Sequence, residues 1–391
     1  MPELPDLPSF ELRAGAKKEP ERIGSTHFGF LGIGQAGGRI AQTFYEFGYP
    51  AVAVNTAPQD LEVLTMPADL RLHTPTSSAG GAGKDMDVGR KAFLSAAGMV
   101  KDILRRAFED VEHIIVCVGA GGGSGGGAAA EAIKLSREFL AAKEAGASGQ
   151  FHVGKRVGII STLPDHGEAV PRVAANAIRV VKEVRDAGPS PWIIIDNQEV
   201  RRLLGSLPPA RYWPTANGVI SGLLHSINLM AAQPSHAALD PADFRSILGE
   251  SGCAILGSAR VEEVWDTAEL MVAIRDALGS TLLGSGFDWS TCISCGAVVV
   301  ANDELMEKQA GLSEAISYVF DQLGEMTAGA VVHRGIYADS SVTGVRIYMI
   351  LGGLDLPAER MRALAARAPG LATAGEFDDL YGEQRDNARL T

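Results

Sequence analysis

The sequence predicts an α/β fold: a parallel sheet with helices on both faces, then a long helix and a smaller α+β domain. Three observations support this fold class. From residue 27 to about 205, short apolar segments alternate with glycine-rich turns and helical segments, which is typical of a parallel sheet. Residues 215–232 carry apolar side chains at helical spacing and predict one long helix. Beyond Pro234 the alternation is less regular, which indicates a different architecture.

Each element is expected from its local pattern. Residues 27–33 predict a short buried strand, and residues 39–47 predict the helix that follows it. Further strands are expected at 51–55, 113–118, 157–160 and 192–195, with a polar loop at 72–88 and helices at 89–108 and 126–145. The second part is expected to contain helices at 241–250, 262–278 and 311–327 and strands at 296–301, 330–337 and 344–351. The resulting division is a flexible tail over 1–26, an α/β domain over 27–212, a core helix over 213–235, an α+β domain over 236–360, and a C-terminal helix and tail over 361–391.

The composition excludes several classes of protein. With 46% hydrophobic and 21% charged residues, the chain can bury substantial cores and is not mostly disordered. Its net charge of −12 argues against a nucleic-acid partner or an anionic membrane surface, because both need a basic face. No apolar stretch reaches membrane-spanning length and the N-terminus lacks a signal-peptide core, so we expect a cytoplasmic protein without direct membrane insertion. An anionic ligand would have to be held locally, by backbone amides or a metal.

The four cysteines exclude a disulfide scaffold. Cys292 and Cys295 form a CxxC pair, but a zinc ribbon needs a second pair, which the sequence lacks. We therefore expect both to be core or strand residues, and no protein metal site is predicted.

Two glycine-rich turns are candidate phosphate-binding loops. Gly32–Gly37 fits GxGxxG between a strand and a helix, where backbone amides and the helix N-terminus favour a phosphate. A dinucleotide site also wants an acidic residue at the end of the second strand, and Asn55 stands there, which counts against NAD. Gly119–Gly127 is more specific, because seven of its nine residues are glycine. We expect a long loop there whose amides wrap an anion, with the Ser124 hydroxyl as a further donor.

Other interpretations of the second turn fit less well. Gly122–Gly126 also matches GxSxG, the nucleophile elbow of α/β hydrolases, but an elbow needs no surrounding glycines and leaves the first turn unexplained. A flexible linker would not be flanked by a strand and a helix. A Walker-type P-loop is excluded, because no GxxxxGK[ST] occurs and Lys84 is followed by Asp85.

Several motifs occur in one order along the chain: GIGQAGGRI at 32–40, VAVNT at 52–56, GAGKDMDVGRKA at 81–92, GAGGGSGGG at 119–127, TLPDHGEAVPR at 162–172 and LDPAD at 239–243. Together they resemble the tubulin/FtsZ family of self-assembling GTPases, and the resemblance extends from about residue 28 to 352. GAGGGSGGG is similar to the family signature GGGTGTG, and GQAG at 34–37 is closer to tubulin than to FtsZ. The resemblance implies the tubulin/FtsZ fold, in which a Rossmann-like GTPase domain precedes the long helix and the smaller domain.

The resemblance also implies a ligand and roles for individual residues. The ligand is GTP or GDP, with Mg²⁺ carried by the nucleotide near Gln35. Glu168 would bind the ribose and Asn217 would read the guanine edge. The implied nucleotide-binding residues are Gly34, Gln35, Ala36, Arg39, Asn55, Gly83, Gly119, Gly121, Gly122, Gly123, Ser124, Gly125, Gly126, Pro164, Glu168, Arg172 and Asn217.

The implied catalytic residues are Asp240 and Asp243. In the family this loop enters the nucleotide pocket of the next subunit and polarises the attacking water. The implied partner is therefore another copy of this chain, in head-to-tail filaments whose hydrolysis requires assembly.

Several positions depart from the family pattern. Ala238 replaces the Asn of the family's NxDxxD loop and cannot bond water or nucleotide, so we expect slow hydrolysis. Gly126 replaces the second Thr of the signature, Arg39 replaces an Asn or Gln near the base, and Pro241 replaces an aromatic residue. These changes leave open a non-hydrolysing structural homologue that forms a dimer or a static filament, with an NAD-dependent enzyme as a remoter alternative. The C-terminal DDLYGEQRDNARLT does not resemble the FtsZ peptide that binds membrane adaptors, so the sequence names no adaptor.

Some of these residues also have purely structural interpretations. Glu168 and Arg172 are spaced i, i+4 and could pair on a helix. Asp240 before a proline could cap a helix, and Asn217 could be another cap. His225 is expected to be a buried, hydrogen-bonded histidine rather than a ligand.

Overall fold

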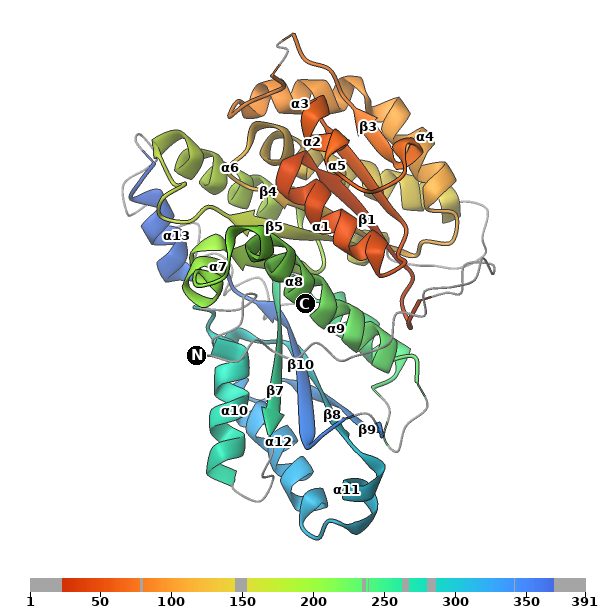
Figure 1. The fold of residues 1–391 in the computed structure, drawn as a ribbon, viewed down its shortest axis with the longest axis vertical. Coiled ribbons are helices and arrows are strands. Elements are labelled where there is room, and N and C mark those ends of the chain that lie inside the picture. Colours follow the sequence, from red (N-terminus) through yellow and green to blue (C-terminus); the bar gives the residue numbers. More distant parts are fainter. Residues whose placement is uncertain are drawn as a thin grey trace.

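The fold is built on one sheet, in the order β3-β2-β1-β4-β5-β6-β7-β10-β8-β9 among the described residues (Figure 1). The computed structural model describes residues 23–77, 80–144, 153–233, 237, 239–261, 267–279, 286–340 and 342–368. The strands of the first part are β1 (Phe28–Ile33), β2 (Ala51–Asn55), β3 (Arg71–His73), β4 (His113–Gly119), β5 (Val157–Leu163) and β6 (Trp192–Asp196). Those of the second part are β7 (Cys253–Val261), β8 (Ser294–Ala301), β9 (Val331–Ala338) and β10 (Val345–Leu354).

Strand direction divides the sheet into two parts. From β3 to β6 all neighbours pair in parallel, so the carboxyl ends of these strands meet at one edge. Strands β7 and β8 both pair antiparallel to β10, and β9 runs parallel to β8. The two parts join where Trp192 of β6 pairs with Cys253 of β7. The predicted α/β class and the parallel sheet are confirmed.

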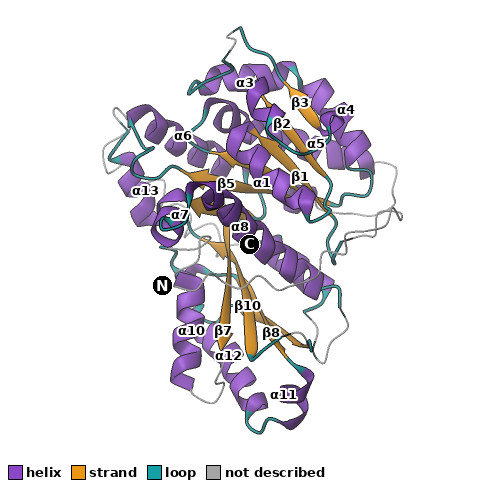
Figure 2. Cartoon of the chain, viewed as in Figure 1, coloured by secondary structure: helices purple, strands orange, loops and turns teal. Residues whose placement is uncertain are grey.

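Helices cover both sides of the sheet and bury two cores (Figure 2). Alternate residues of β1 point into different cores, as the two-residue repeat of a strand requires: Leu31 and Ile33 into the first, Phe28 and Phe30 into the second. The first core is covered by α3 (Met86–Ser95), α4 (Ala97–Ala107), α5 (Gly123–Glu144), α6 (Pro171–Ala187), α10 (Thr267–Gly279), α11 (Asp303–Lys308), α12 (Leu312–Met326) and α13 (Ala358–Ala365). The second is covered by α1 (Gly34–Glu46), α2 (Pro58–Glu62), α7 (Asn197–Leu204), α8 (Pro209–Met230) and α9 (Pro241–Leu248). Short 3₁₀ turns are η1 (Ala68–Leu70), η2 (Val153–Arg156) and η3 (Trp289–Thr291).

Several element boundaries differ from the prediction. The long helix α8 starts at Pro209, earlier than the predicted 215, because proline is well suited to the first helical position. Residues 89–108 form two helices that break at Ala96 rather than one. Strand β7 was not predicted, and neither were β3, α7 and α11; helix α13 begins at Ala358, before the predicted C-terminal helix and tail over 361–391.

The predicted N-terminal tail over 1–26 ends too late. The amide of Thr26 donates to Oδ1 of Asn228 in α8 at 2.9 Å, and the backbone of Ser25 is bonded to the same residue. Residues 23–26 are therefore held on the long helix. Residues 1–22, residues 262–266 of one predicted helix, and residues 369–391 lie outside the described parts of the chain.

Candidate functional site

The glycine turns after β1 and β4 lie against each other at the carboxyl edge of the parallel strands. Helix α1 begins directly after Ile33, at Gly34, whose φ of +74° favours glycine. A Cβ on Gly34 would lie 3.0 Å from the amide nitrogen of Gly125. One on Gly37 would lie 2.0 Å from the carbonyl oxygen of Cys117, so α1 packs directly on β4. The structure thus brings the two predicted phosphate loops together.

The second turn is shorter than predicted. Helix α5 begins at Gly123, so residues 120–122 alone connect it to β4, and the expected nine-residue loop is wrong. Close packing explains much of the glycine excess: a Cβ on Gly123 would lie 2.8 Å from the Gly83 carbonyl oxygen, and one on Gly127 would lie 2.1 Å from that of Met86. A Cβ on Gly122 would lie 3.8 Å from its nearest neighbour. The turn leads into the N-terminus of a long helix, whose dipole favours an anion, whereas the amides of Gly122 and Gly123 already donate to the carbonyl oxygens of Gly119 at 3.4 Å and Gly83 at 3.0 Å.

The remaining predicted residues of these turns line the same edge. A Cβ on Gly119 would lie 3.1 Å from Ala36, so the first residues of α1 border the second turn. Cβ atoms on Gly121 and Gly126 would meet Val173 and Ala120. Gln35 is exposed, and Ala36 and Arg39 are half-buried.

Thr56, directly after β2, ties three segments of the edge together. Its side-chain oxygen lies 2.6 Å from the Ser124 hydroxyl and accepts the amide of Ala82 at 2.9 Å. Ser124 therefore already has a protein partner, and that partner holds the loop around Gly83. No role was predicted for Thr56, because its contacts are with residues 26 and 68 positions away in the chain.

Asn55 does not face an open site. Its side chain is buried, donates to the Asp60 carboxylate at 3.1 Å, and accepts the Ala57 amide at 3.2 Å. These two hydrogen bonds stabilise the turn into α2, and the predicted nucleotide-binding role of Asn55 stays a prediction.

Helix α6 fastens the loop of residues 80–85 to the second glycine turn. Asn176 donates to the carbonyl oxygens of Lys84 at 2.9 Å and Gly121 at 3.2 Å. Arg172 donates to the Asp85 carboxylate at 3.2 Å, and Asp85 also caps α3. Asn176 was not predicted as a site residue, although its i, i+4 spacing places it on one helix face with Arg172.

The loop after β5 carries Glu168. The Glu168 carboxylate accepts the amide of Asp165 and the side-chain amide of Asn197, each at 3.1 Å. The Asp165 carboxylate accepts the Glu168 amide in return, at 2.7 Å. Helix α6 starts only at Pro171 and Arg172 bonds elsewhere, so a Glu168–Arg172 helix pair is wrong. The Pro164 carbonyl oxygen accepts a hydrogen bond from Arg360 of α13 at 2.6 Å.

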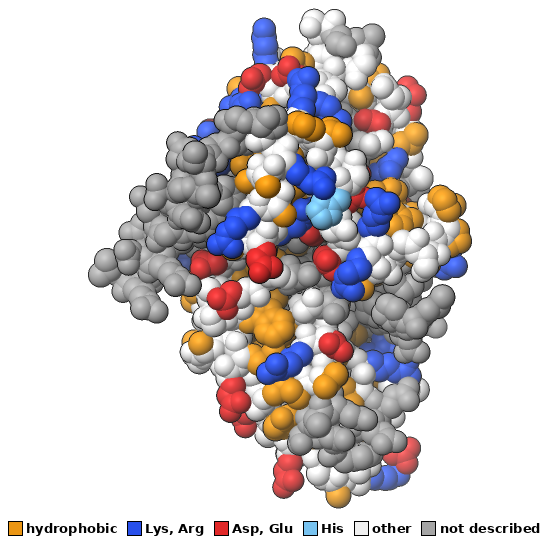
Figure 3. Space-filling view, turned by 90° about the vertical axis from the view of Figure 1, so that its left-hand side faces the viewer, with side chains coloured by type: hydrophobic (Ala, Val, Ile, Leu, Met, Phe, Trp, Pro, Cys, Tyr) orange, Lys and Arg blue, Asp and Glu red, His pale blue; other side chains and the backbone are white. Residues whose placement is uncertain are grey.

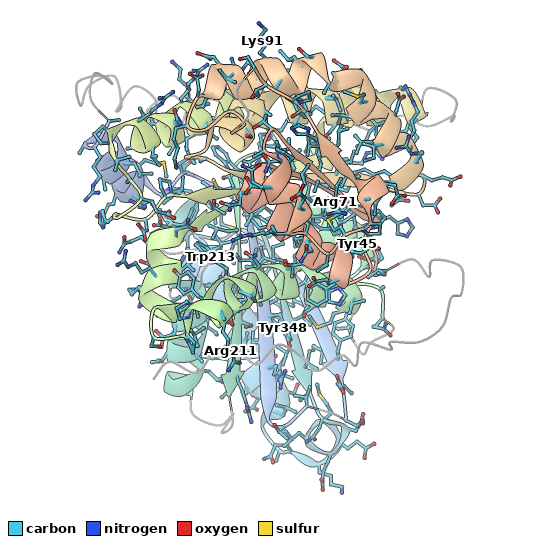
Figure 4. The ribbon with its side chains drawn as sticks, turned by 45° about the horizontal axis from the view of Figure 1, so that its top comes forward. Tyr45, Arg71, Lys91, Arg211, Trp213 and Tyr348 are labelled. Carbon is cyan, nitrogen blue, oxygen red and sulfur yellow. The ribbon has the colours of Figure 1, made fainter. Side chains whose placement is uncertain are left out.

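Asn217 lies in the interior of α8, so it is not a helix cap. Its side chain is half-buried and has no hydrogen-bond partner among the described residues. Trp213 precedes it by one helical turn and therefore shares its face; Figure 4 marks Trp213 in the same N-terminal part of the helix as Arg211. Burial, and then the negative charges of Asp165 and Glu168, raise the pKa of Tyr212 in α8 above its usual value.

Asp240 and Asp243 lie at the opposite edge of the sheet. Phe244 packs against Phe28, the first residue of β1, with 6.4 Å between ring centroids. The glycine turns follow the other end of β1, about 17 Å away at the rise of a six-residue strand. The end of α8, near the Asp240 loop, is likewise about 20 Å along the helix axis from Asn217. The structure therefore does not bring the predicted catalytic pair to the predicted nucleotide residues of the same chain.

Both carboxylates have partners. Asp240 Oδ1 accepts the amides of Ala242 at 2.7 Å and Asp243 at 2.8 Å, so Asp240 is the N-cap of α9. Asp243 Oδ1 lies 2.9 Å from Nδ1 of His333 in β9, a contact that sequence analysis missed. The Ile336 amide also donates to the Ala237 carbonyl oxygen at 2.7 Å, so β9 supports this loop. Ala238 lies outside the described residues.

The two cysteines of the CxxC pair lie where the sequence predicts them, because Cys292 and Cys295 are buried in the core. The described residues contain no His/Cys/Asp/Glu group suited to a metal ion. His225 is half-buried rather than fully buried, and its Nδ1 lies 3.0 Å from the Tyr49 hydroxyl, so the predicted hydrogen-bonded histidine is present. Among the described helices, none has the length and apolar character needed to cross a bilayer. On the face drawn in Figure 3, acidic and basic side chains are interspersed.

Comparison with known proteins agrees with this geometry. Residues 29–205 match the model of the Tubulin/FtsZ family, GTPase domain. The chain is 26% identical over 341 residues to cell division protein FtsZ 2 of Halobacterium salinarum, an alignment that covers 85% of this chain and 80% of that protein.

Solved structures show the same fold over nearly the whole chain. The protofilament of Bacillus thuringiensis serovar israelensis TubZ in its GTPγS form superposes with a TM-score of 0.74 at 21% identity, covering 94% of this chain and 95% of that one. The GTPγS-bound protofilament of Haloferax volcanii CetZ2 gives a TM-score of 0.69 at 22% identity, covering 91% and 100%. The glycine turns and strands β2 to β6, with all but the first residue of β1, lie within residues 29–205, the part of the chain that matches the GTPase domain of the Tubulin/FtsZ family, and the long helix and the second part of the sheet follow it in the same fold as these solved structures.

Proposed function

We propose that this protein binds GTP at the carboxyl edge of its parallel strands and hydrolyses it after assembling head to tail. The observation that carries the proposal is the position of the two predicted sites at opposite edges of the sheet. Phe244, next to Asp243, packs on the first residue of β1, whereas the glycine turn at Gly34 follows the last. Stacking one copy on the next in the same orientation would bring the Asp240 loop of one subunit to the nucleotide of its neighbour. Such a contact is heterologous and produces an open filament.

The residues of the carboxyl edge suit the parts of a nucleoside triphosphate. The N-terminus of α5 suits phosphate oxygens, because the helix dipole and the amides of its first turn beyond Gly123 attract negative charge. The Glu168 carboxylate, held by Asn197, would accept hydrogen bonds from the ribose hydroxyls. Asn217, which has no protein partner among the described residues, offers both a donor and an acceptor to the guanine edge.

In the proposed reaction, a water oxygen attacks the γ-phosphorus and the bond to the bridging oxygen of GDP breaks, which gives GDP and phosphate. Asp243 of the neighbouring subunit would orient the water by accepting a hydrogen bond from it. Asp240 lies beside Asp243, at the start of α9. Mg²⁺ carried by the phosphates near Gln35 would neutralise their charge, since no Walker lysine is present.

We further propose that each chain is divided into the GTPase domain over 27–212, the core helix over 213–235 and the C-terminal domain over 236–360. This division is supported by the change from parallel to antiparallel pairing between β6 and β10. Within it, α8 would connect the nucleotide pocket at one end to the Asp240 loop at the other.

A mixing experiment tests catalysis between subunits. Asp243→Ala would keep the nucleotide pocket but remove the catalytic carboxylate. Asn217→Leu combined with Glu168→Ala would keep that carboxylate but remove nucleotide binding. Neither variant alone should turn GTP over. In an equal mixture, about one quarter of random head-to-tail contacts join an intact nucleotide pocket to an intact Asp243. About one quarter of wild-type turnover should therefore return. A mixture that stays inactive while both variants join filaments would refute the proposal.

A static, non-hydrolysing filament is the second candidate. It is favoured by Asp240, one carboxylate oxygen of which already accepts two α9 amides and so is committed to the helix. This candidate predicts GTP binding and assembly by the wild-type chain without release of phosphate.

A further inference from the structure

Helix α13 connects the last part of the chain to the edge of the candidate nucleotide site. It follows β10 in the second part of the sheet, yet it packs on α6 in the first part, beside α7 (Figure 1). No role was predicted for this helix, and no step of the proposed reaction uses it.

Arg360 of α13 makes the main contact. Its guanidinium donates to both oxygens of the Asp196 carboxylate, from Nε at 2.6 Å and from Nη2 at 2.9 Å. Nη2 also donates to the Pro164 carbonyl oxygen at 2.6 Å. The arginine side chain is 12% exposed and the aspartate 16%, so solvent screens this pair little. Further along the chain, Arg367 donates to the His166 carbonyl oxygen at 2.6 Å.

The groups that Arg360 holds are next to the groups that orient Glu168. Pro164 precedes Asp165, whose amide donates to the Glu168 carboxylate. Asp196 precedes Asn197, whose side-chain amide donates to the same carboxylate. One guanidinium thus fixes the ends of β5 and β6, and each of these ends supplies one of the two hydrogen bonds that set the direction of the Glu168 side chain.

We propose that Arg360 is a positioning residue for nucleotide binding, which fixes the loop that presents Glu168 to the ribose. The inference rests on the proposed function, because it requires a nucleotide at this loop. It also assigns α13 a function: the affinity of the pocket for GTP depends on α13 being docked on α6.

The test is GTP binding by titration calorimetry with nucleotide-free full-length protein. Arg360→Met alone would leave the Asp196 charge unpaired, so it is combined with Asp196→Asn, which keeps the cap of α7. We expect this double variant to bind GTP about tenfold more weakly, within the usual range of coupling through a packed network. The turnover of the double variant at saturating GTP should stay close to wild type, because Asp243 of the neighbouring subunit is unchanged. An unchanged affinity would overturn the inference.

The matched control is Arg362→Met on the same helix. Arg362 is exposed and its side chain has no hydrogen-bond or ion-pair partner among the described residues. Its variant should bind GTP like wild type; an equal loss in both would show that any substitution in α13 weakens binding, and would contradict the inference. If the double variant does not fold, Arg360→Lys serves instead, because a lysine keeps the charge but cannot form the bidentate pair. It should weaken binding by a smaller factor, and full wild-type affinity in this variant would count against the inference.

A double-mutant cycle shows whether the effect passes through Glu168. In a Glu168→Ala background, the combined change at Arg360 and Asp196 should weaken GTP binding less than twofold, since the group being positioned is gone. A full tenfold loss in that background would overturn the inference. The proposed function is judged separately: a wild-type chain that binds no GTP refutes it, whereas a binding wild type with unaffected Arg360 variants refutes the positioning role alone.

Discussion

Replacing Thr56 by valine tests how the two glycine turns and the loop at Gly83 are held in one arrangement. Valine matches the shape of threonine but lacks the hydroxyl, so it removes the 2.6 Å contact to Ser124 and the 2.9 Å hydrogen bond from Ala82. Thr56 is 4% exposed, so water cannot replace these partners. Two hydrogen bonds at about 1 kcal/mol each, with a further penalty for the orphaned amide, predict a loss of about 2–4 kcal/mol in the free energy of unfolding.

The same change should weaken GTP binding, because Ser124 and the Gly83 loop border the proposed phosphate site. We expect about tenfold weaker affinity in titration calorimetry for Thr56→Val. Thr56→Ser is the control, since serine keeps the hydroxyl and loses only a methyl group, at a cost of about 1 kcal/mol in stability. If the valine variant binds GTP as tightly as the serine variant, the hydroxyl does not organise the site and the reasoning fails.

Three further predictions each concern one buried or hydrogen-bonded residue. His333→Leu should lower GTP turnover about tenfold without changing GTP affinity, because it releases the Asp243 carboxylate, and His333→Asn should restore turnover by donating from the same position; equal turnover in all three proteins would contradict this. Asn228→Ala should lower the free energy of unfolding by about 3 kcal/mol in urea titrations, since it leaves the buried Thr26 amide without a partner, and a loss below about 1 kcal/mol would show that the N-terminal segment contributes little. Burial lowers the pKa of His113 from 6.5 to about 3, so the unfolded chain binds more protons between these values. Stability should therefore fall as pH decreases below about 6.5, and His113→Gln should flatten this dependence; an equally steep profile in the variant would rule His113 out as its cause.

The parallel part of the sheet was predictable because its strands are continuous apolar segments bounded by turns. Strand β7 was missed, because Cys253–Val261 contains Gly257 and polar residues and draws its stability from neighbours β6 and β10. A Cβ on Gly257 would lie 2.3 Å from the Ala277 carbonyl oxygen, so this glycine permits a close helix contact that local sequence does not reveal. The packing of α13 could not be predicted, because the helix is short and it contacts α6 in the first part of the fold.

The site was predictable as a set of turns but not in its connections. The glycine motifs located both turns, and the structure places them against each other. Their excess of glycine was interpreted as a long anion-binding loop, whereas much of it allows α5 to pack against α3, as Gly127 does against Met86. The contacts that orient side chains join residues far apart in the chain, such as Thr56 with Ser124 and Arg360 with Pro164. A single sequence contains no periodic or local signal for such pairs.

The central claim is that one copy of the chain holds the nucleotide and the next copy supplies Asp243. Its most direct test is the rate of phosphate release from GTP per subunit, measured over a wide range of concentrations of the wild-type protein. The account predicts almost no release below a threshold concentration and a rise above it, as subunits begin to contact one another. A measurable rate per subunit that stays constant across the whole range would contradict it.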